Sequence, residues 1–462
     1  MAARPRQGYT IDMTSGSLLK KMLRFAIPLA LSTLLQLLFN AADLVVVSRF
    51  AGDNAMAAVG ANSTLTKLMV NMFNGVSVGA NVLAARERGA GDRQEVYCTV
   101  HTSMALSLVA GAIVLLIGLI GSDRILQLMQ IPENILPQAS LYLKIYFIGI
   151  PANLIYNFGA ALLRSVGDTK RPLYYLTFAG VVNVLLNLVL VIVFHLDVAG
   201  VAIATAASQI ISAYLVVRCL MHEESDIRLD IKALQLRGDK LKEILRVGLP
   251  AGVQASIFSL SNVIIQSSFN SFGEVVIAGH SAANNIQGFV HCIDTALSST
   301  VLSFTSQNLG AKKYDRVPRV LLTAYGCLAI TFSVVISAVL HWGELLLGIY
   351  SQTPEVIAVG MVEFRIMLST LIICGAMNVT ASAMRGLGKS FTSMVVSLIG
   401  VCGFRMVWIL TIFQIPAYHT IESLYMSYPI SWTATLAIHL CCWVHAVRKL
   451  RKEHGEQEKL SA

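Results

Sequence analysis

The chain has 462 residues, of which 55% are hydrophobic and only 13% are charged, and its mean hydropathy is +0.66. This composition excludes an ordinary soluble globular protein, in which about 25% of residues are charged, and indicates a protein that lies in a lipid bilayer. The net charge of +9 fits attraction to anionic lipid headgroups. No basic motif with interleaved aromatic residues is present, so we expect membrane lipid and no nucleic acid as a partner.

Apolar stretches long enough to cross a hydrocarbon core of roughly 30 Å recur along the whole chain. We predict twelve, at residues 22–48, 55–83, 95–121, 136–162, 173–194, 198–220, 243–270, 276–306, 318–341, 356–384, 391–414 and 425–447. Lipid offers no hydrogen-bond partner to a backbone amide, and the alternation of a barrel strand is absent, so these stretches must be helices. The predicted fold class is an all-α membrane protein with twelve transmembrane helices.

The second half of the chain repeats the first at a spacing of about 222 residues. Pro28 near the start of the first span corresponds to Pro250 in the seventh, and Asn62 corresponds to Asn284. The turn sequence Leu-Arg-Ser-Val-Gly-Asp at 163–168 is answered by Met-Arg-Gly-Leu-Gly-Lys at 384–389. Such a constant register predicts two similar six-helix bundles, an architecture typical of transporters.

The predicted domains follow from this repeat. Residues 1–221 form the first lobe, 222–242 a polar linker, 243–447 the second lobe and 448–462 a tail. The linker has alternating charges, and we leave open whether it is an interfacial helix or a plain solvated segment.

Lys and Arg residues gather at the termini and in every second loop. By the positive-inside rule, this bias predicts that both termini lie in the cytoplasm and that the chain is a multi-pass protein of the cytoplasmic membrane.

No phosphate-binding G-x-x-x-x-G-K-[ST] loop occurs in the sequence, so any transport should draw on an ion gradient. Ionisable residues within the spans then become informative, because a charge at the membrane centre costs on the order of 2.5–3.5 kcal/mol. Three acidic residues qualify, Asp43, Asp294 and Glu363, and the roles of the last two stay open.

Asp43 ends a polar stripe on the first predicted helix. Ser32, Gln36, Asn40 and Asp43 are spaced by four, four and three residues and therefore share one helix face. The fifth span offers Asn183 and Asn187, and the sixth offers Thr205. One carboxylate with several neutral oxygens suits a proton or Na⁺, whereas the alternative is that these polar groups only hold helices together. The repeat places Ile265 opposite Asp43, so the acidic site is expected in the first half alone.

The two-fold plan, Pro28 with Asp43, and the paired Arg-x-x-Gly turns resemble the multidrug and toxic compound extrusion (MATE) family of cation-coupled exporters. The resemblance implies antiport of organic, often cationic or amphiphilic, compounds against H⁺ or Na⁺ by alternating access. It implies a cation site of Asp43, Asn183, Asn187 and Thr205, to which we add Asn40, with Asp43 as the ligand if the ion is Na⁺. Asn187 stands where some members carry a second Asp, which leaves Asp43 as the one titratable group of this set.

For the substrate cavity we predict Gln36, Met69, Phe73, Asn284 and Met377 as lining residues, because flexible or polar side chains suit varied small organic substrates. We expect no cofactor other than the coupling ion, no enzyme activity and a monomer. A lipid-linked oligosaccharide flippase of the same superfamily remains the alternative, although only Lys67 and Arg405 are basic candidates within spans.

Overall fold

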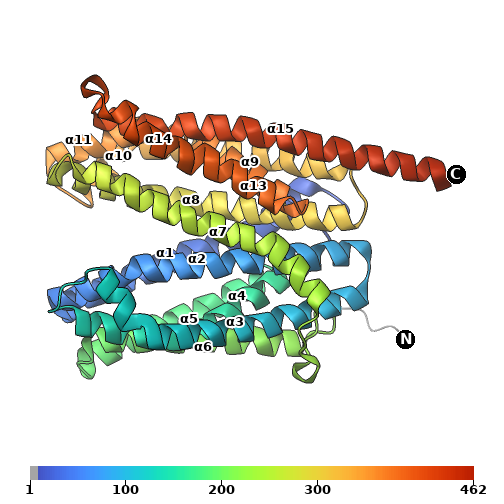
Figure 1. Cartoon of the computed structure of the whole chain (residues 1–462), viewed down its shortest axis with the longest axis horizontal. Coiled ribbons are helices and arrows are strands. Elements are labelled where there is room, and N and C mark those ends of the chain that lie inside the picture. Colours follow the sequence, from blue (N-terminus) through green and yellow to red (C-terminus); the bar gives the residue numbers. More distant parts are fainter. Residues whose placement is uncertain (1–8, 462) are drawn as a thin grey trace. The chain divides into compact units, whose positions relative to one another are not determined.

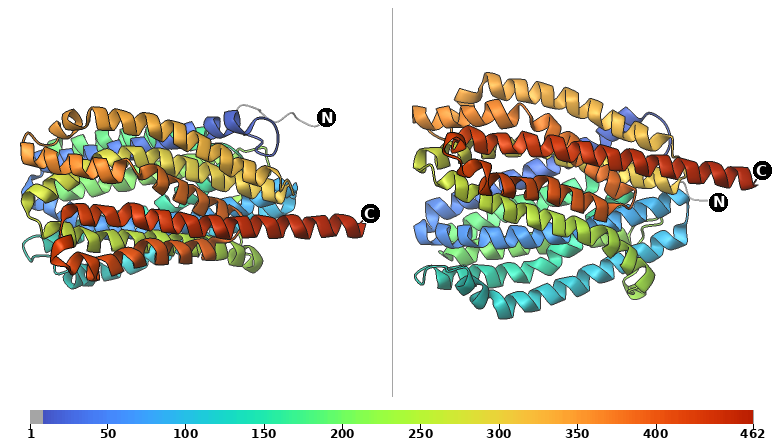
Figure 2. Two further views of the ribbon diagram at one scale, coloured as in Figure 1. Left: turned by 90° about the horizontal axis from the view of Figure 1, so that it is seen from above. Right: turned by 45° about the horizontal axis from the view of Figure 1, so that its top comes forward.

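The computed structural model describes residues 9–461, except the side chains of residues 53, 54, 64 and 454–461. Every regular element in this part of the chain is a helix (Figure 1). Both views of Figure 2 show the helices of each half running roughly alongside one another. All twelve predicted spans are helical, which confirms the predicted fold class.

The helices of the first half are α1 (Leu18–Phe50), α2 (Gly52–Ala90), α3 (Arg93–Leu128), α4 (Leu136–Ser165), α5 (Lys170–Leu188) with its π-helical extension η1 (Val189–Val193), and α6 (Asp197–Met221). The predicted linker contains only the short 3₁₀ helix η2 (Ile231–Ala233) before α7 begins. The part of the predicted linker before α7 is therefore mostly non-helical, but it is not simply solvated, because Ile227 and Leu229 are buried in a hydrophobic cluster of unit 1.

The second half contains α7 (Gly238–Asn270), α8 (Glu274–Gly310), α9 (Arg316–His341), α10 (Gly343–Gly348), α11 (Pro354–Glu363), η3 (Phe364–Leu368), α12 (Leu371–Gly386), α13 (Ser390–Ser397), η4 (Leu398–Gly403), α14 (Phe404–Leu410), η5 (Ile412–Gln414), η6 (Pro416–Tyr418) and α15 (Ile421–Ser461). The tenth span is bent by 46° between its two parts, 354–368 and 371–386. Its first part ends in the π-helix η3, which the sequence did not predict.

Ten helices in the described part of the chain are long and apolar enough to cross a membrane, and the bent pair adds an eleventh. The remaining predicted span, α8, is long enough at 37 residues but contains no stretch that is apolar enough to count with these helices. Several of its polar side chains are buried inside its own half, including His280, Gln287 and Asp294.

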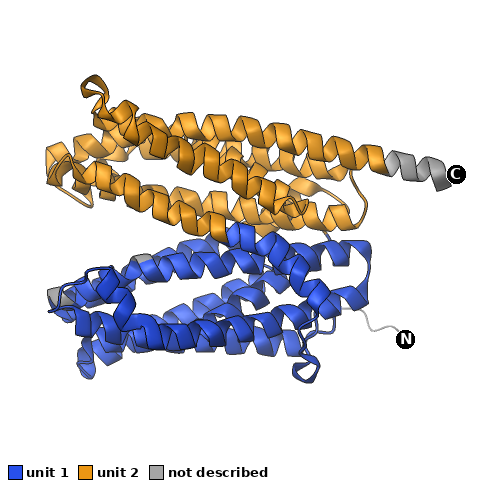
Figure 3. Cartoon of the chain, in the orientation of Figure 1, with its two compact units in different colours: residues 1–12, 27–252 blue, residues 13–26, 253–462 orange. Residues whose placement is uncertain are grey.

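The chain forms two compact units that each take a segment from the other half of the sequence. Unit 1 comprises residues 1–12 and 27–252, and unit 2 comprises residues 13–26 and 253–462 (Figure 3). The helices α1 and α7 are therefore each divided, close to Pro28 and Pro250 respectively. Proline removes a backbone hydrogen bond from a helix and permits a bend, so both divisions fall where the helix is least constrained.

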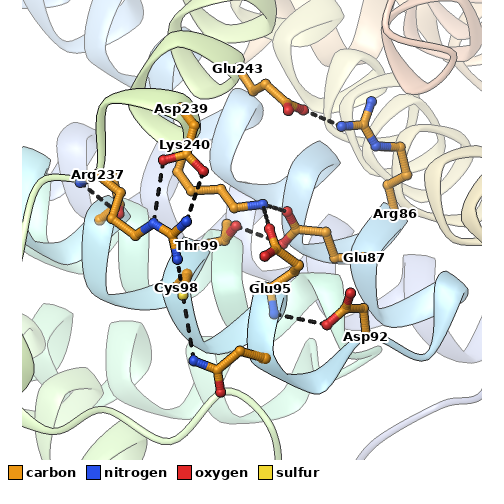
Figure 4. Close-up of polar contacts among 12 residues, drawn as sticks. Arg86, Glu87, Asp92, Glu95, Cys98, Thr99, Arg237, Asp239, Lys240 and Glu243 are labelled. Atoms are coloured by element: carbon orange, nitrogen blue, oxygen red, sulfur yellow. Dashed lines mark hydrogen bonds and ion pairs between the residues drawn. The ribbon is translucent and has the colours of Figure 1, made fainter.

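The start of α7 is fixed in unit 1 by a network of charged side chains (Figure 4). The ammonium group of Lys240 pairs with the carboxylates of Glu87 and Glu95, and the Thr99 hydroxyl donates to Glu87 at 2.6 Å. Lys240 and Glu87 are both buried. Nearby, Arg237 donates to the Cys98 sulfur at 2.9 Å.

Close packing of α2 against α7 continues this attachment. A Cβ atom on Gly75 or Gly79 of α2 would overlap backbone atoms of Gly252 or Ile244. Glycine is therefore required at both positions for the two backbones to approach. The start of α1 is held in unit 2 by different contacts: Gln307 accepts from the Met13 amide at 2.9 Å, and Asn308 donates to the Met13 carbonyl at 3.1 Å.

Candidate functional site

The predicted polar stripe of α1 meets α5 through one close helix contact. Phe39 packs its ring against Gly180, where any Cβ atom would overlap the ring. Gly180, Asn183 and Asn187 are three and four residues apart, so they share the face of α5 that meets α1. The same contact therefore brings the asparagines to the level of Asp43, one turn beyond Phe39 on α1.

Asp43, Asn187 and Asn183 form a connected group in unit 1. The side-chain amide of Asn187 donates to a carboxylate oxygen of Asp43, and it lies 3.5 Å from the Asn183 side-chain oxygen. Asn187 is fully buried, Asn183 is 5% exposed, and Asp43 is half-buried. Within the described residues, Asp43 has no ion pair with a lysine or arginine. A half-buried carboxylate with one neutral donor is therefore available for a cation.

Asn187 also carries an unpartnered acceptor. Its side-chain oxygen is buried and has no hydrogen-bond partner among the described residues. Leaving a buried polar atom unpaired costs about 1–3 kcal/mol, so such an atom beside a carboxylate needs an explanation. A hard cation held between the Asp43 carboxylate and the Asn187 oxygen would remove this cost. The π-helix η1 begins two residues after Asn187, and π-helical turns are frequent at functional sites.

The other predicted members of the cation site are placed less tightly. The Thr205 hydroxyl is half-buried and donates to the Val201 carbonyl of its own helix at 2.9 Å, which leaves its oxygen free to accept. Asn40 is exposed on α1. No group of three or more His, Cys, Asp or Glu side chains suited to a metal ion occurs in the described part of the chain. The donor set therefore fits a proton or Na⁺ and does not resemble a transition-metal centre.

The predicted substrate-cavity residues fall in both units. In unit 1, Gln36 is exposed, while Met69 and Phe73 are half-buried against the apolar core of that unit. In unit 2, Met377 is 2% exposed, and Asn284 lies on the surface of α8 with its amide 2.8 Å from Nε2 of His280. Asn284 is therefore a partner of a buried histidine, a role that the sequence did not indicate.

Two buried polar groups in unit 2 were not assigned from the sequence. Asp294 accepts from Asn378 at 2.6 Å. Glu363 is fully buried, lies 2.8 Å from Nδ1 of His280, and accepts from Gln287 at 2.6 Å and from Tyr425 at 3.0 Å. These partners are 62 to 83 residues from Glu363 in the sequence, so helical spacing gave no signal for this cluster. The position in the second half that corresponds to Asp43 is occupied by Ile265, which is buried and apolar.

Comparison with known proteins identifies the family to which this chain belongs. A family model described as MatE matches residues 28–189 and 250–411. The two matches begin 222 residues apart, which confirms the predicted repeat. Together they cover more than half of the chain, and the chain belongs to the MatE family of membrane transporters.

Curated relatives match over nearly the whole length. "Probable multidrug resistance protein YoeA" of Bacillus subtilis (strain 168) is 26% identical over 431 residues, which is 91% of this chain and 92% of the relative. "Multidrug export protein MepA" of Staphylococcus saprophyticus is 22% identical over 427 residues, with 92% of each protein covered.

Solved structures show the same fold. A MOP superfamily transporter from Pyrococcus furiosus matches with a TM-score of 0.89 at 19% identity, over 95% of this chain and 98% of that one. The outward-facing conformation of a multidrug resistance MATE family transporter also gives a TM-score of 0.89 at 19% identity, over 97% and 100% of the two chains.

Proposed function

We propose that the protein is a cation-coupled antiporter that exports small organic compounds, cationic or amphiphilic in character, across the cytoplasmic membrane. The observation that carries the proposal is the pairing of a half-buried carboxylate, Asp43, with the unpartnered buried oxygen of Asn187. The names of the relatives, which refer to multidrug resistance and export, support the substrate class. The coupling ion is H⁺ or Na⁺, and the transporter acts as a monomer.

The chemistry of the site suggests how an ion is coupled to transport. The Asn187 amide nitrogen donates to Asp43. A proton on Asp43 would neutralise the carboxylate, whereas Na⁺ would be held by the carboxylate with amide and hydroxyl oxygens of Asn187, Asn183 and Thr205. Either ion removes a charge from the membrane interior. The ion then shifts the equilibrium between conformations only by the difference in its affinity for them.

Orientation follows from the distribution of basic residues. The positive-inside bias puts both termini in the cytoplasm. Asp43 lies seven residues before the end of α1 at Phe50, about 10 Å at 1.5 Å per residue, and Phe50 then faces the outside. External cations would therefore reach Asp43 over a short path.

A flippase for lipid-linked pyrophosphates is the less favoured alternative. Of its two candidate basic residues, Arg405 is buried with its guanidinium 3.9 Å from the centre of the Tyr428 ring, and it donates to Ser431. Arg405 is thus engaged within unit 2, and only Lys67 remains exposed. One lysine is a weak site for a pyrophosphate group.

The test is transport of a cationic dye by the purified protein in lipid vesicles, with the pH gradient and the Na⁺ gradient imposed separately. We expect one of the gradients to drive accumulation in the parent. Asp43→Asn mimics the neutralised carboxylate and should abolish gradient-driven accumulation while dye binding persists. Asp123→Asn is the matched control, because Asp123 pairs with Lys144 at an exposed position. Accumulation by Asp43→Asn at the parental rate would refute the assignment.

A further inference from the structure

Unit 2 contains a buried acid–base cluster where α8, α11 and α15 meet. Glu363 on α11 is fully buried, and its partners His280, Gln287 and Tyr425 are 3%, 2% and 0% exposed. Oε2 of Glu363 lies 2.8 Å from His280 Nδ1 and accepts from the Tyr425 hydroxyl at 3.0 Å, and Oε1 accepts from Gln287 at 2.6 Å. The three polar neighbours of the Glu363 carboxyl group are thus an imidazole, a neutral amide and a hydroxyl, and of these His280 is the one that can carry a positive charge.

Glu363 lacks a permanently charged basic partner. Within the described residues, no lysine or arginine pairs with it, and its one basic partner is His280. A buried carboxylate that is not compensated by a cation is strongly disfavoured in a membrane interior. The charge that this cluster can acquire is a proton on His280.

Asn284 can form a hydrogen bond with Nε2 of His280 whether the imidazole is neutral or doubly protonated. The Asn284 side chain lies 2.8 Å from Nε2, and Nδ1 is turned to Glu363. With neutral His280, the amide NH₂ of Asn284 donates to the unprotonated Nε2. With His280 doubly protonated, Nε2–H donates to the Asn284 amide oxygen after a half-turn of the amide. Nδ1–H donates to Glu363 in both states, so a proton can bind or leave without loss of a hydrogen bond.

The cluster is closed on one side and open on the other. The His280 ring stacks on Phe269 of α7 with the ring centres 4.0 Å apart and the planes at 18°, and Phe269 is fully buried. Asn284, on the opposite edge of the imidazole, is exposed. The Nε2 edge of the imidazole therefore lies on the side of the cluster that is next to the exposed Asn284.

Other ionisable groups lie on the elements that pack around the cluster. On α15, Glu422 and Tyr428 interact electrostatically with Tyr425. Arg405 of α14 is engaged by Tyr428, and Glu344 of α10, the short helix that packs on both α8 and α11, is exposed. Arg405 is therefore engaged by another partner and not by Glu363.

The repeat and the backbone set this cluster apart from ordinary helix packing. The residues of unit 1 that correspond to His280 and Asn284 are Ala58 and Asn62, and the Asn62 amide donates to the Ala58 and Ala139 carbonyls at 2.9 Å. The same place in unit 1 is thus held by a neutral contact. In addition, the π-helix η3 begins at the residue after Glu363, as η1 follows Asn187.

We propose that His280, Glu363 and Asn284 form a proton-binding site in unit 2, separate from the Asp43 site in unit 1, and that its occupancy sets the pH range in which the transporter works. The inference rests on the proposed transport function for its effect, but proton binding itself does not. On binding, Nε2 gains the proton from water and the cluster passes from one negative charge to zero.

The direct test is ¹⁵N NMR of the full-length protein labelled at histidine, titrated from pH 5 to pH 9. His280 is assigned as the signal lost in His280→Gln, and His291→Gln is the matched control because His291 is exposed on the same helix. We expect the His280 imidazole to change from the neutral Nδ1–H form to the doubly protonated form within this range. In Glu363→Gln the imidazole should stay neutral, because its counter-charge is gone, and Tyr425→Phe should retain the transition. A single protonation state of His280 throughout the range would overturn the proposal.

The second readout is the pH profile of dye transport in vesicles. In His280→Gln, the part of the pH profile that depends on His280 protonation should disappear or shift by about one to three pH units. Such a shift is expected when a nearby opposite charge is lost. His291→Gln should leave the profile unchanged. If Asp43→Asn abolishes coupling while His280→Gln keeps the parental profile, the proposed function holds and this inference fails. If the parent transports no dye, the NMR titration still decides whether the site binds a proton.

Discussion

Replacing Lys240 with methionine should release the start of α7 from unit 1. Lys240 is 5% exposed and serves two carboxylates, of which Glu87 is 7% exposed. Removing one partner of a buried pair leaves a buried charge without compensation, which costs about 3–5 kcal/mol. We therefore expect Lys240→Met to destabilise the attachment of α7 by that amount.

Cys98 provides a local assay for this release. It is 2% exposed, and Arg237 of the segment before α7 donates to its sulfur. In a protein whose other seven cysteines are replaced, a maleimide should label Cys98 slowly in the parent and faster by two or more orders of magnitude in Lys240→Met, as about 3 kcal/mol or more implies.

The controls separate a buried pair from an exposed one. Lys449→Met removes a surface pair with Glu453, which is worth about 0–1 kcal/mol, and should leave labelling unchanged. The double variant Glu87→Gln with Lys240→Met removes both buried charges and should recover much of the loss. Parental labelling rates and an unchanged melting temperature in Lys240→Met would refute the reasoning.

Two glycine predictions distinguish a rigid contact from an adjustable one. Gly180→Ala should push the Phe39 ring from its place and weaken cation-dependent transport, measured as dye uptake. Adding Phe39→Ala to the same protein should restore the uptake. Parental uptake in Gly180→Ala alone would argue against the α1–α5 contact. Gly75→Ala meets the backbone of Gly252 and has no such rescue, so we expect about 1–3 kcal/mol of destabilisation or more, seen as a lower melting temperature in detergent.

The helices were predictable because hydropathy and helix length are local properties. Every predicted span is helical. The spacing of Asn183 and Asn187 predicted that they share a helix face, and in the structure Asn187 of that face donates to Asp43. What the sequence did not contain is the depth of each side chain. Asn40 and Asn187 look equivalent in a polar stripe, yet Asn40 is exposed and Asn187 is buried, because only the packing of Phe39 on Gly180 decides which residues face the neighbour.

The cluster around Glu363 was missed for a different reason. Its members come from three helices far apart in the sequence, and each alone is an isolated polar residue in an apolar span. The repeat did not reveal it either, since Ala58 stands at the position of His280. The π-helical turns were also unpredicted, because a single extra residue per turn leaves the apolar pattern almost unchanged.

The division of α1 and α7 between the two units has a consequence for how the protein is made. Residues 13–26 leave the ribosome long before Gln307 and Asn308, their hydrogen-bond partners nearly 300 positions later. The first segment of unit 2 is thus synthesised long before the rest of that unit. Unit 1 stays incomplete until residues 238–252 have been synthesised. A gene split within the linker would yield two polypeptides that each lack one docking segment. Neither polypeptide should reach its native packing unless both are synthesised in the same membrane.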